Sequence, residues 1–102
     1  MKYSLQRTRD GRGDSGPMSD AYTPIYDEDG KLVNYTTEHN SEPKVGVVMR
    51  VGSMLARSYS AQDCWHTTLI TEILERRADP KDPESIYVRF KTVNSEYEWQ
   101  SF

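Results

Sequence analysis

Cysteine is nearly absent from this chain of 102 residues, and long apolar runs are missing altogether. The single cysteine, Cys64, excludes an internal disulfide. No stretch reaches the roughly 18 apolar residues of a membrane-spanning helix, and Met1–Asp10 lacks the apolar segment of a secretory signal. These absences predict a cytoplasmic protein with no membrane partner.

Apolar side chains are also scarce, at 35% of the residues, while aromatic residues reach 11% because the chain contains seven tyrosines and two tryptophans. A chain of this length forms one domain, and small domains bury a low share of their surface. We therefore expect the large aromatic rings to supply much of the core. Trp99, on the apolar side of the last extended segment, is predicted to be structural.

Charge is unevenly distributed around the formal net value of −3. Residues 1–12 carry four basic side chains against one acid, and residues 13–43 carry seven acids against Lys31 alone. Residues 44–102 hold equal numbers of both signs and offer no field for a polyanion. The basic first segment is thus the one place where phosphate contacts are expected.

Residues 1–20 are predicted to be a flexible arm. The stretch from Arg9 to Pro17 contains three glycines, a proline and no apolar side chain, so it cannot offset the entropy lost on ordering. Within it, Gly13-Asp-Ser-Gly-Pro17 is similar to the nucleophile segment of trypsin-like proteases. The chain is too short for the double barrel of such enzymes, so catalysis is not expected there.

Residues 21–43 are predicted to form a β-hairpin and a linker. Asp29-Gly30 separates two short runs rich in apolar and aromatic residues, which is a strong signal for a two-residue turn. Two strands alone are marginal in water. We therefore expect the hairpin to lie on the remaining chain, or to be exchanged with a second copy in a homodimer.

Residues 44–102 are predicted to form a small β-barrel. Short segments with alternating apolar residues are separated by turn signals, which is typical of a barrel or sandwich. The fold class is therefore mainly β, a partly open barrel of about five strands preceded by the hairpin. The segments expected to be extended are 44–52, 53–59, 65–74, 86–90 and 95–102.

An alternative α+β fold with a helix at 61–77 remains open. Ala61, Trp65, Leu69 and Ile73 recur every four residues, as on one side of a helix. The same stretch is rich in β-branched threonine and isoleucine, which favours a strand.

The order of these segments resembles the small barrels of the Tudor type. Gly52 stands where that family opens its first strand, and Trp65 follows the loop. Val88-Arg89-Phe90 leads into a turn with Asn94. The resemblance implies a barrel. Tudor domains that read methylated side chains carry an aromatic in that turn, and this chain has none. Tyr59 and Trp65 remain as two candidate walls of a cage, although the ordinary interpretation places Trp65 in the core.

The segments TTLITEIL and KTVNSEYEW also resemble small accessory proteins of bacteria and tailed phages. Members of that group with an assigned activity usually bind and block a host protein. The resemblance implies a protein partner in a host cell.

Chemistry-bearing residues are too few for an enzyme. Cys64 and His66 lie two apart, but His39 is the only other histidine or cysteine, short of the four ligands of a structural zinc site. Asp63 is close in sequence, but no aspartate or asparagine is compellingly placed to orient a Cys–His pair. We expect no catalytic residue, no cofactor and no metal.

The sequence instead predicts a non-catalytic module that binds a protein. Tyrosine and tryptophan combine large contact area with a polar tip, which suits interfaces. An alternative is a nucleic-acid-binding barrel whose basic arm touches phosphates. The candidate residues for protein contact are Tyr22, Tyr26, Tyr35, Tyr59 and Trp65, and those for phosphate contact are Arg7, Arg9 and Arg12.

Overall fold

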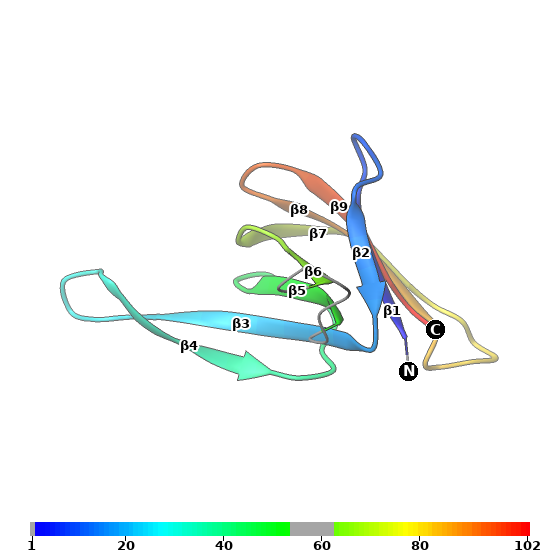
Figure 1. Ribbon diagram of the computed structural model, residues 1–102, viewed down its shortest axis with the longest axis horizontal. Helices are drawn as coiled ribbons and strands as arrows, with labels where there is room; N and C mark the ends of the chain where they lie inside the picture. Colours follow the sequence, from blue (N-terminus) through cyan, green and yellow to red (C-terminus); the bar gives the residue numbers. More distant parts are fainter. Residues whose placement is uncertain (1, 54–62) are drawn as a thin grey trace.

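A computed structural model describes residues 2–53 and 63–102, which form nine strands and no helix (Figure 1). The mainly β fold class is confirmed, and the alternative helix is wrong over 63–77. The strands are β1 Tyr3–Arg7, β2 Gly13–Gly16, β3 Met18–Tyr26, β4 Leu32–Glu38, β5 Val48–Ser53, β6 Asp63–His66, β7 Ile70–Ala78, β8 Ile86–Thr92 and β9 Glu96–Ser101.

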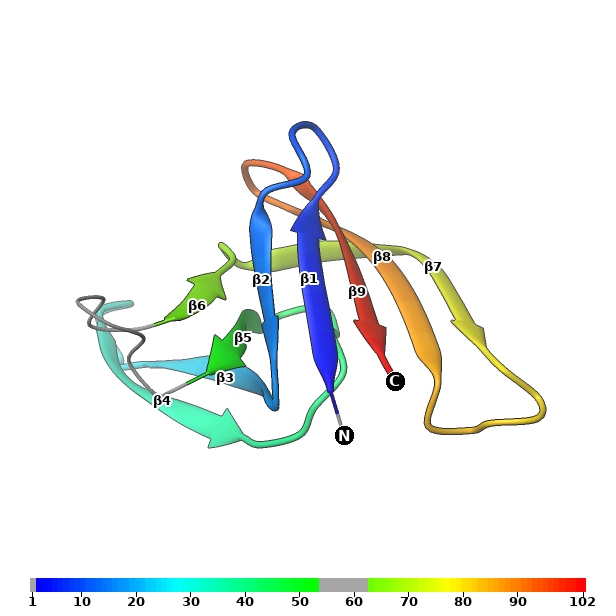
Figure 2. The same cartoon turned by 45° about the vertical axis from the view of Figure 1, so that its right-hand side comes forward.

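The strands make two antiparallel sheets. Sheet A has the order β2-β1-β9-β8-β7, and sheet B has the order β4-β3-β5-β6. In Figure 2 the strands of sheet B run across those of sheet A, so the fold is a partly open, crossed pair of sheets. The predicted segment 53–59 lies largely outside the described residues.

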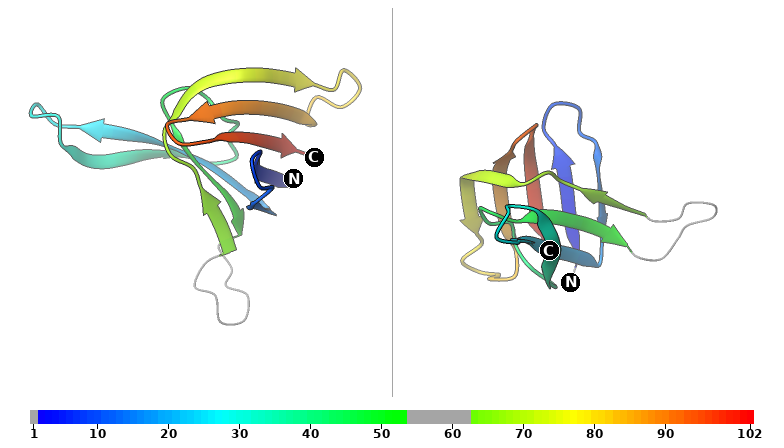
Figure 3. Two further views of the ribbon diagram at one scale, coloured as in Figure 1. Left: turned by 90° about the horizontal axis from the view of Figure 1, so that it is seen from above. Right: turned by 90° about the vertical axis from the view of Figure 1, so that its left-hand side faces the viewer.

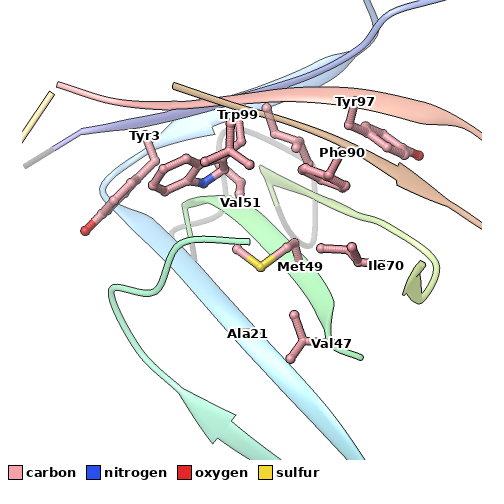
Figure 4. Packing of buried hydrophobic residues seen from close by; sticks show 11 residues of the cluster. Tyr3, Ala21, Val47, Met49, Val51, Ile70, Phe90, Tyr97 and Trp99 are labelled. Atoms are coloured by element: carbon pink, nitrogen blue, oxygen red, sulfur yellow. The ribbon is translucent and has the colours of Figure 1, made fainter. Parts of the chain in front are cut away.

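The core lies between the two sheets (Figure 4). The ring of Trp99 stacks on that of Tyr3 with their centroids 5.7 Å apart. Trp99 Nε1 donates a 2.9 Å hydrogen bond to Ser19 Oγ, so the indole joins sheet A to sheet B. The prediction that Trp99 is structural is confirmed. The buried apolar residues are Tyr3, Leu5, Ala21, Val47, Met49, Val51, Ile70, Val88, Phe90, Tyr97 and Trp99.

The prediction of a flexible arm over 1–20 is wrong for its described residues. Strand β1 lies inside sheet A, between β2 and β9, with Leu5 opposite Trp99. Tyr3 and Leu5 alternate with polar residues and are buried at 2% and 0% exposure. Two apolar side chains suffice to hold β1 in the fold because sheet B packs over them. The core therefore does not begin at residue 44, because β1 to β4 belong to the same two sheets as the strands that follow residue 44.

The glycines of β2 have a packing role. A Cβ atom on Gly16 would collide with the carbonyl group of Gly52 in β5, where the two sheets touch. A Cβ atom on Gly13 would collide with the carbonyl oxygen of Leu5. The glycine content that looked like disorder in the sequence is what allows these backbones to approach each other.

The single strand expected at 65–74 is broken into β6 and β7, which belong to different sheets. Thr67 forms the corner between them. Its Oγ1 accepts a 3.0 Å bond from Met49 N, while its own N donates a 2.9 Å bond to Met49 O. These bonds satisfy the backbone where the chain leaves sheet B for sheet A.

The hairpin predicted before residue 43 is confirmed, and its base is part of sheet B. β3 pairs with β5 only from Met18 to Tyr22, whereas it pairs with β4 from Ala21 to Tyr26. Beyond Val48, the first residue of β5, β3 and β4 project from the rest of the molecule (Figures 1 and 3). All seven residues of β4 are exposed. We call residues 22–37 the projecting hairpin.

Candidate functional site

The tip of the projecting hairpin is ordered by Asp27. Its Oδ1 accepts bonds of 2.9 Å from the N atoms of Asp29 and Lys31, and its own N donates to Lys31 O at 2.9 Å. Gly30 has φ of 78°, a left-handed conformation that favours glycine. The connection between the strands thus runs over 27–31, longer than the predicted two-residue turn, and holds the hairpin in one register.

The outer side of sheet B carries a pocket of about 280 Å³. The strand alternation that directs Met49 and Val51 into the core directs their neighbours outward. Val48 lies opposite Tyr22, and Arg50 lies opposite His66. The pocket is lined by Tyr22, Tyr35, Val48, Arg50 and His66, drawn from all four strands of the sheet. We call it the tyrosine pocket.

Two tyrosine rings form one wall of this pocket. The rings of Tyr22 and Tyr35 meet edge to face with centroids 6.2 Å apart and planes at 84°, a favourable aromatic geometry. Arg50 Nη1 donates a 3.3 Å bond to Tyr22 Oη and so fixes that ring. The pocket therefore offers flat apolar surface with polar atoms along one side.

The electrostatic character of the pocket comes from Arg50. Partial burial lowers the pKa of His66, and the positive charge of Arg50 lowers it further. His66 is therefore mainly neutral at physiological pH, and Arg50 supplies the cationic charge of the lining. Beside the pocket, Asp20 lies opposite Arg50 in the ladder and its Oδ1 lies 3.0 Å from His39 Nδ1.

The predicted contact residues divide into separate groups. Tyr22 and Tyr35 come together in the tyrosine pocket, and Tyr26 lies near the tip with 58% of its surface exposed. Trp65 packs against the core from β6, and its Nε1 donates a 3.4 Å bond to Tyr97 Oη. Tyr59 lies outside the described residues.

The three predicted arginines lie on the β1–β2 hairpin. Arg7 Nη2 is 2.6 Å from Asp10 Oδ2, and its guanidinium group lies 5.2 Å from the centre of the Trp65 ring. The bond from Arg7 lowers the pKa of Asp10 to about 2. Arg9 and Arg12 are exposed. Arg7 thus has a structural role in joining this hairpin to β6.

Sequence reasoning missed Val48, Arg50 and His66 as lining residues. The alternation of residues 44–52 already placed Val48 and Arg50 on one side of a strand. It could not reveal that this side would be the outer surface, nor that β6 would bring His66 next to Arg50. That neighbourhood depends on the pairing of β5 with β6.

Outside the tyrosine pocket, the described part of the chain shows few features of a functional site. It contains no group of three or more histidine, cysteine or acidic side chains that could hold a metal ion. It likewise contains no helix with the length and apolar character needed to cross a membrane. A second hollow of about 570 Å³ lies near the ends of β7, β8 and β9, where the Arg77 guanidinium group is 4.5 Å from the centre of the Tyr87 ring.

The chain matches no protein-family model, no curated protein and no solved structure.

Proposed function

We propose that this chain is a non-catalytic module that binds and modulates a protein partner through the tyrosine pocket and the projecting hairpin. The observation that carries the proposal is the concentration of exposed apolar surface at one place. Among the described residues, five of the eight exposed large hydrophobic side chains belong to the projecting hairpin: Ile25, Tyr26, Leu32, Val33 and Tyr35.

An apolar surface of this kind suits a protein partner. Interfaces are rich in tyrosine and arginine around an apolar centre, and the tyrosine pocket supplies both residue types beside Val48. A side chain of the partner could enter between Tyr35 and Val48 while its backbone follows the hairpin. The resemblance to accessory proteins of bacteria and tailed phages supports a host protein in the cytoplasm as the target.

The nucleic-acid alternative has less support. Arg7 is held by Asp10 and Trp65, so two of the three arm arginines, Arg9 and Arg12, remain as exposed cations on that hairpin. A complex built on about four phosphate contacts weakens by roughly a hundredfold as salt rises from about 50 to 200 mM, and one built on two contacts by roughly tenfold. We expect the affinity for the protein partner to change far less over that range. A steep loss that flattens in the double variant Arg9→Ala/Arg12→Ala would favour nucleic acid.

The proposal can be tested by photo-crosslinking in the host cell. A benzophenone amino acid replaces Tyr35 in one variant and Val93 in the control. Val93 is 69% exposed but lies in the β8–β9 turn, outside the projecting hairpin. We expect a specific protein other than a second copy of this chain to be captured from position 35 and not from position 93. Capture of the same proteins from both positions, or of none from position 35, would contradict the proposal.

A further inference from the structure

The outer edge of β4 differs from the other sheet edges in the described chain. Edge strands expose unpaired backbone groups, and proteins usually protect them with charge, short length, bulges or proline. β2 and β6 have four residues each, and β7 carries four charged side chains and two register shifts. β4 has seven residues and carries no charge from Leu32 to Thr37, and its single register shift against β3 lies at the tip end of the strand, between Leu32 and Asn34.

The two edges of the projecting hairpin are themselves unequal. On the β3 side, Pro24 lies just beyond the last residue paired with β5 and has no N–H to donate. On the β4 side, Tyr35 lies opposite Pro24, and Tyr35 N donates a 2.8 Å bond to Asn34 Oδ1. The Tyr35 N–H therefore points away from β3, toward the open side, where the Asn34 side chain accepts it. Because antiparallel pairs alternate, the N–H of Thr37 points to the same open side.

We propose that a second copy of this chain pairs with β4 through its own β4, antiparallel, so that two sheets B become one continuous sheet. The charges that flank the strand are self-complementary in this arrangement. Antiparallel pairing brings Lys31 of one copy to the end of the strand where Glu38 of the other lies, and does so twice. Lys31 has no ion-pair partner among the described residues of its own chain.

The acidic tips also favour the antiparallel arrangement. Each tip carries Asp27, Glu28 and Asp29, and antiparallel pairing would place the tips of the two copies at opposite ends of the paired strands. For strands of this length the two tips would be about 20 Å apart, which exceeds the Debye length of about 8 Å at physiological salt. Each tip would instead lie near Lys44 of the other copy, whose Nζ is 2.7 Å from Glu38 Oε2 in its own chain. Parallel pairing would bring the acidic tips together.

Pairing of this kind also determines where the two tyrosine pockets lie. The two-fold axis between antiparallel strands is perpendicular to the sheet, so the outer sides of both copies face the same direction. The dimer would therefore present two tyrosine pockets on one continuous surface. The inference concerns the β4 edge and does not depend on the proposed function, since a monomer with one pocket could still bind a partner.

The test is sedimentation of the full chain over a wide concentration range. We expect a particle of twice the 11.8 kDa chain mass to form as concentration rises. Thr37→Pro removes one outward N–H and none of the bonds to β3, so it should weaken the dimer by about tenfold or more. The control, Thr37→Val, keeps the N–H and should dimerise like the parent. A mass of 11.8 kDa at every concentration would overturn the proposal.

A charge swap tests the arrangement without a proline. Lys31→Glu should weaken the dimer by several-fold, and the double variant Lys31→Glu/Glu38→Lys should restore it, because each of the two exposed ion pairs between the copies changes the dissociation constant by about a few-fold. Circular dichroism identifies any variant that has lost its fold, and if Thr37→Pro is one of them the charge swap decides. Dimerisation that is indifferent to Lys31→Glu and to Thr37→Pro, with both variants folded, would show that another surface is used.

Discussion

Leu5 gives the sharpest test of the fold, because the residues around it look dispensable in the sequence. Its side chain is fully buried, and its strand is held on both sides, by β2 and by β9. Neighbouring strands fixed in this way cannot collapse into the space left by truncation. Leu5→Ala should therefore cost about 3–5 kcal/mol in the free energy of unfolding, in the upper part of the range for buried leucine.

That cost is a large share of the roughly 5–15 kcal/mol by which domains of this kind are stable. In urea, with an m-value of about 1–3 kcal/mol/M, the unfolding midpoint followed by circular dichroism should fall by at least about 1 M. The control is Gln6→Ala, an exposed neighbour in the same strand, with an expected change within about 0.5 kcal/mol. An unfolding midpoint for Leu5→Ala equal to that of Gln6→Ala would refute the assignment of β1 to the core.

Two further predictions follow from the contact between the sheets and from the tyrosine pocket. Gly16→Ala should destabilise the fold by about 1–3 kcal/mol in chemical denaturation, because its Cβ meets the Gly52 carbonyl, whereas Ser15→Ala next to it should change little. Burial and the charge of Arg50 lower the pKa of His66 in the folded state, so the unfolded chain binds more protons as pH falls below 6.5. The free energy of unfolding should therefore decrease as pH drops through 6.5, and this decrease should end below the pKa of His66 in the folded state. His66→Gln should remove this part of the pH dependence, and an NMR titration that places the pKa of His66 at 6.5 or above would contradict the prediction.

The hairpin, the outer tyrosines and the structural Trp99 could all be predicted from local features of the sequence. Asp29-Gly30 between two apolar runs encodes a reversal of the chain over a few residues, and the structure changes only the length of the connection. Trp99 lies in a strand whose alternation is visible in the sequence. Such features depend on neighbours close along the chain, so they survive without knowledge of the rest of the fold.

The role of the N-terminal segment was decided by tertiary structure alone. In the sequence alone, the glycines of β2 indicate flexibility. In the structure, Gly16 is required because the backbone carbonyl of Gly52, thirty-six positions later, packs where a Cβ atom of residue 16 would lie. Leu5 is one leucine in a polar stretch until β9 and β2 enclose it. The tyrosine pocket has the same origin. Local patterns fix which side chains share one side of a strand, but long-range pairing decides which strands are neighbours and which side is covered.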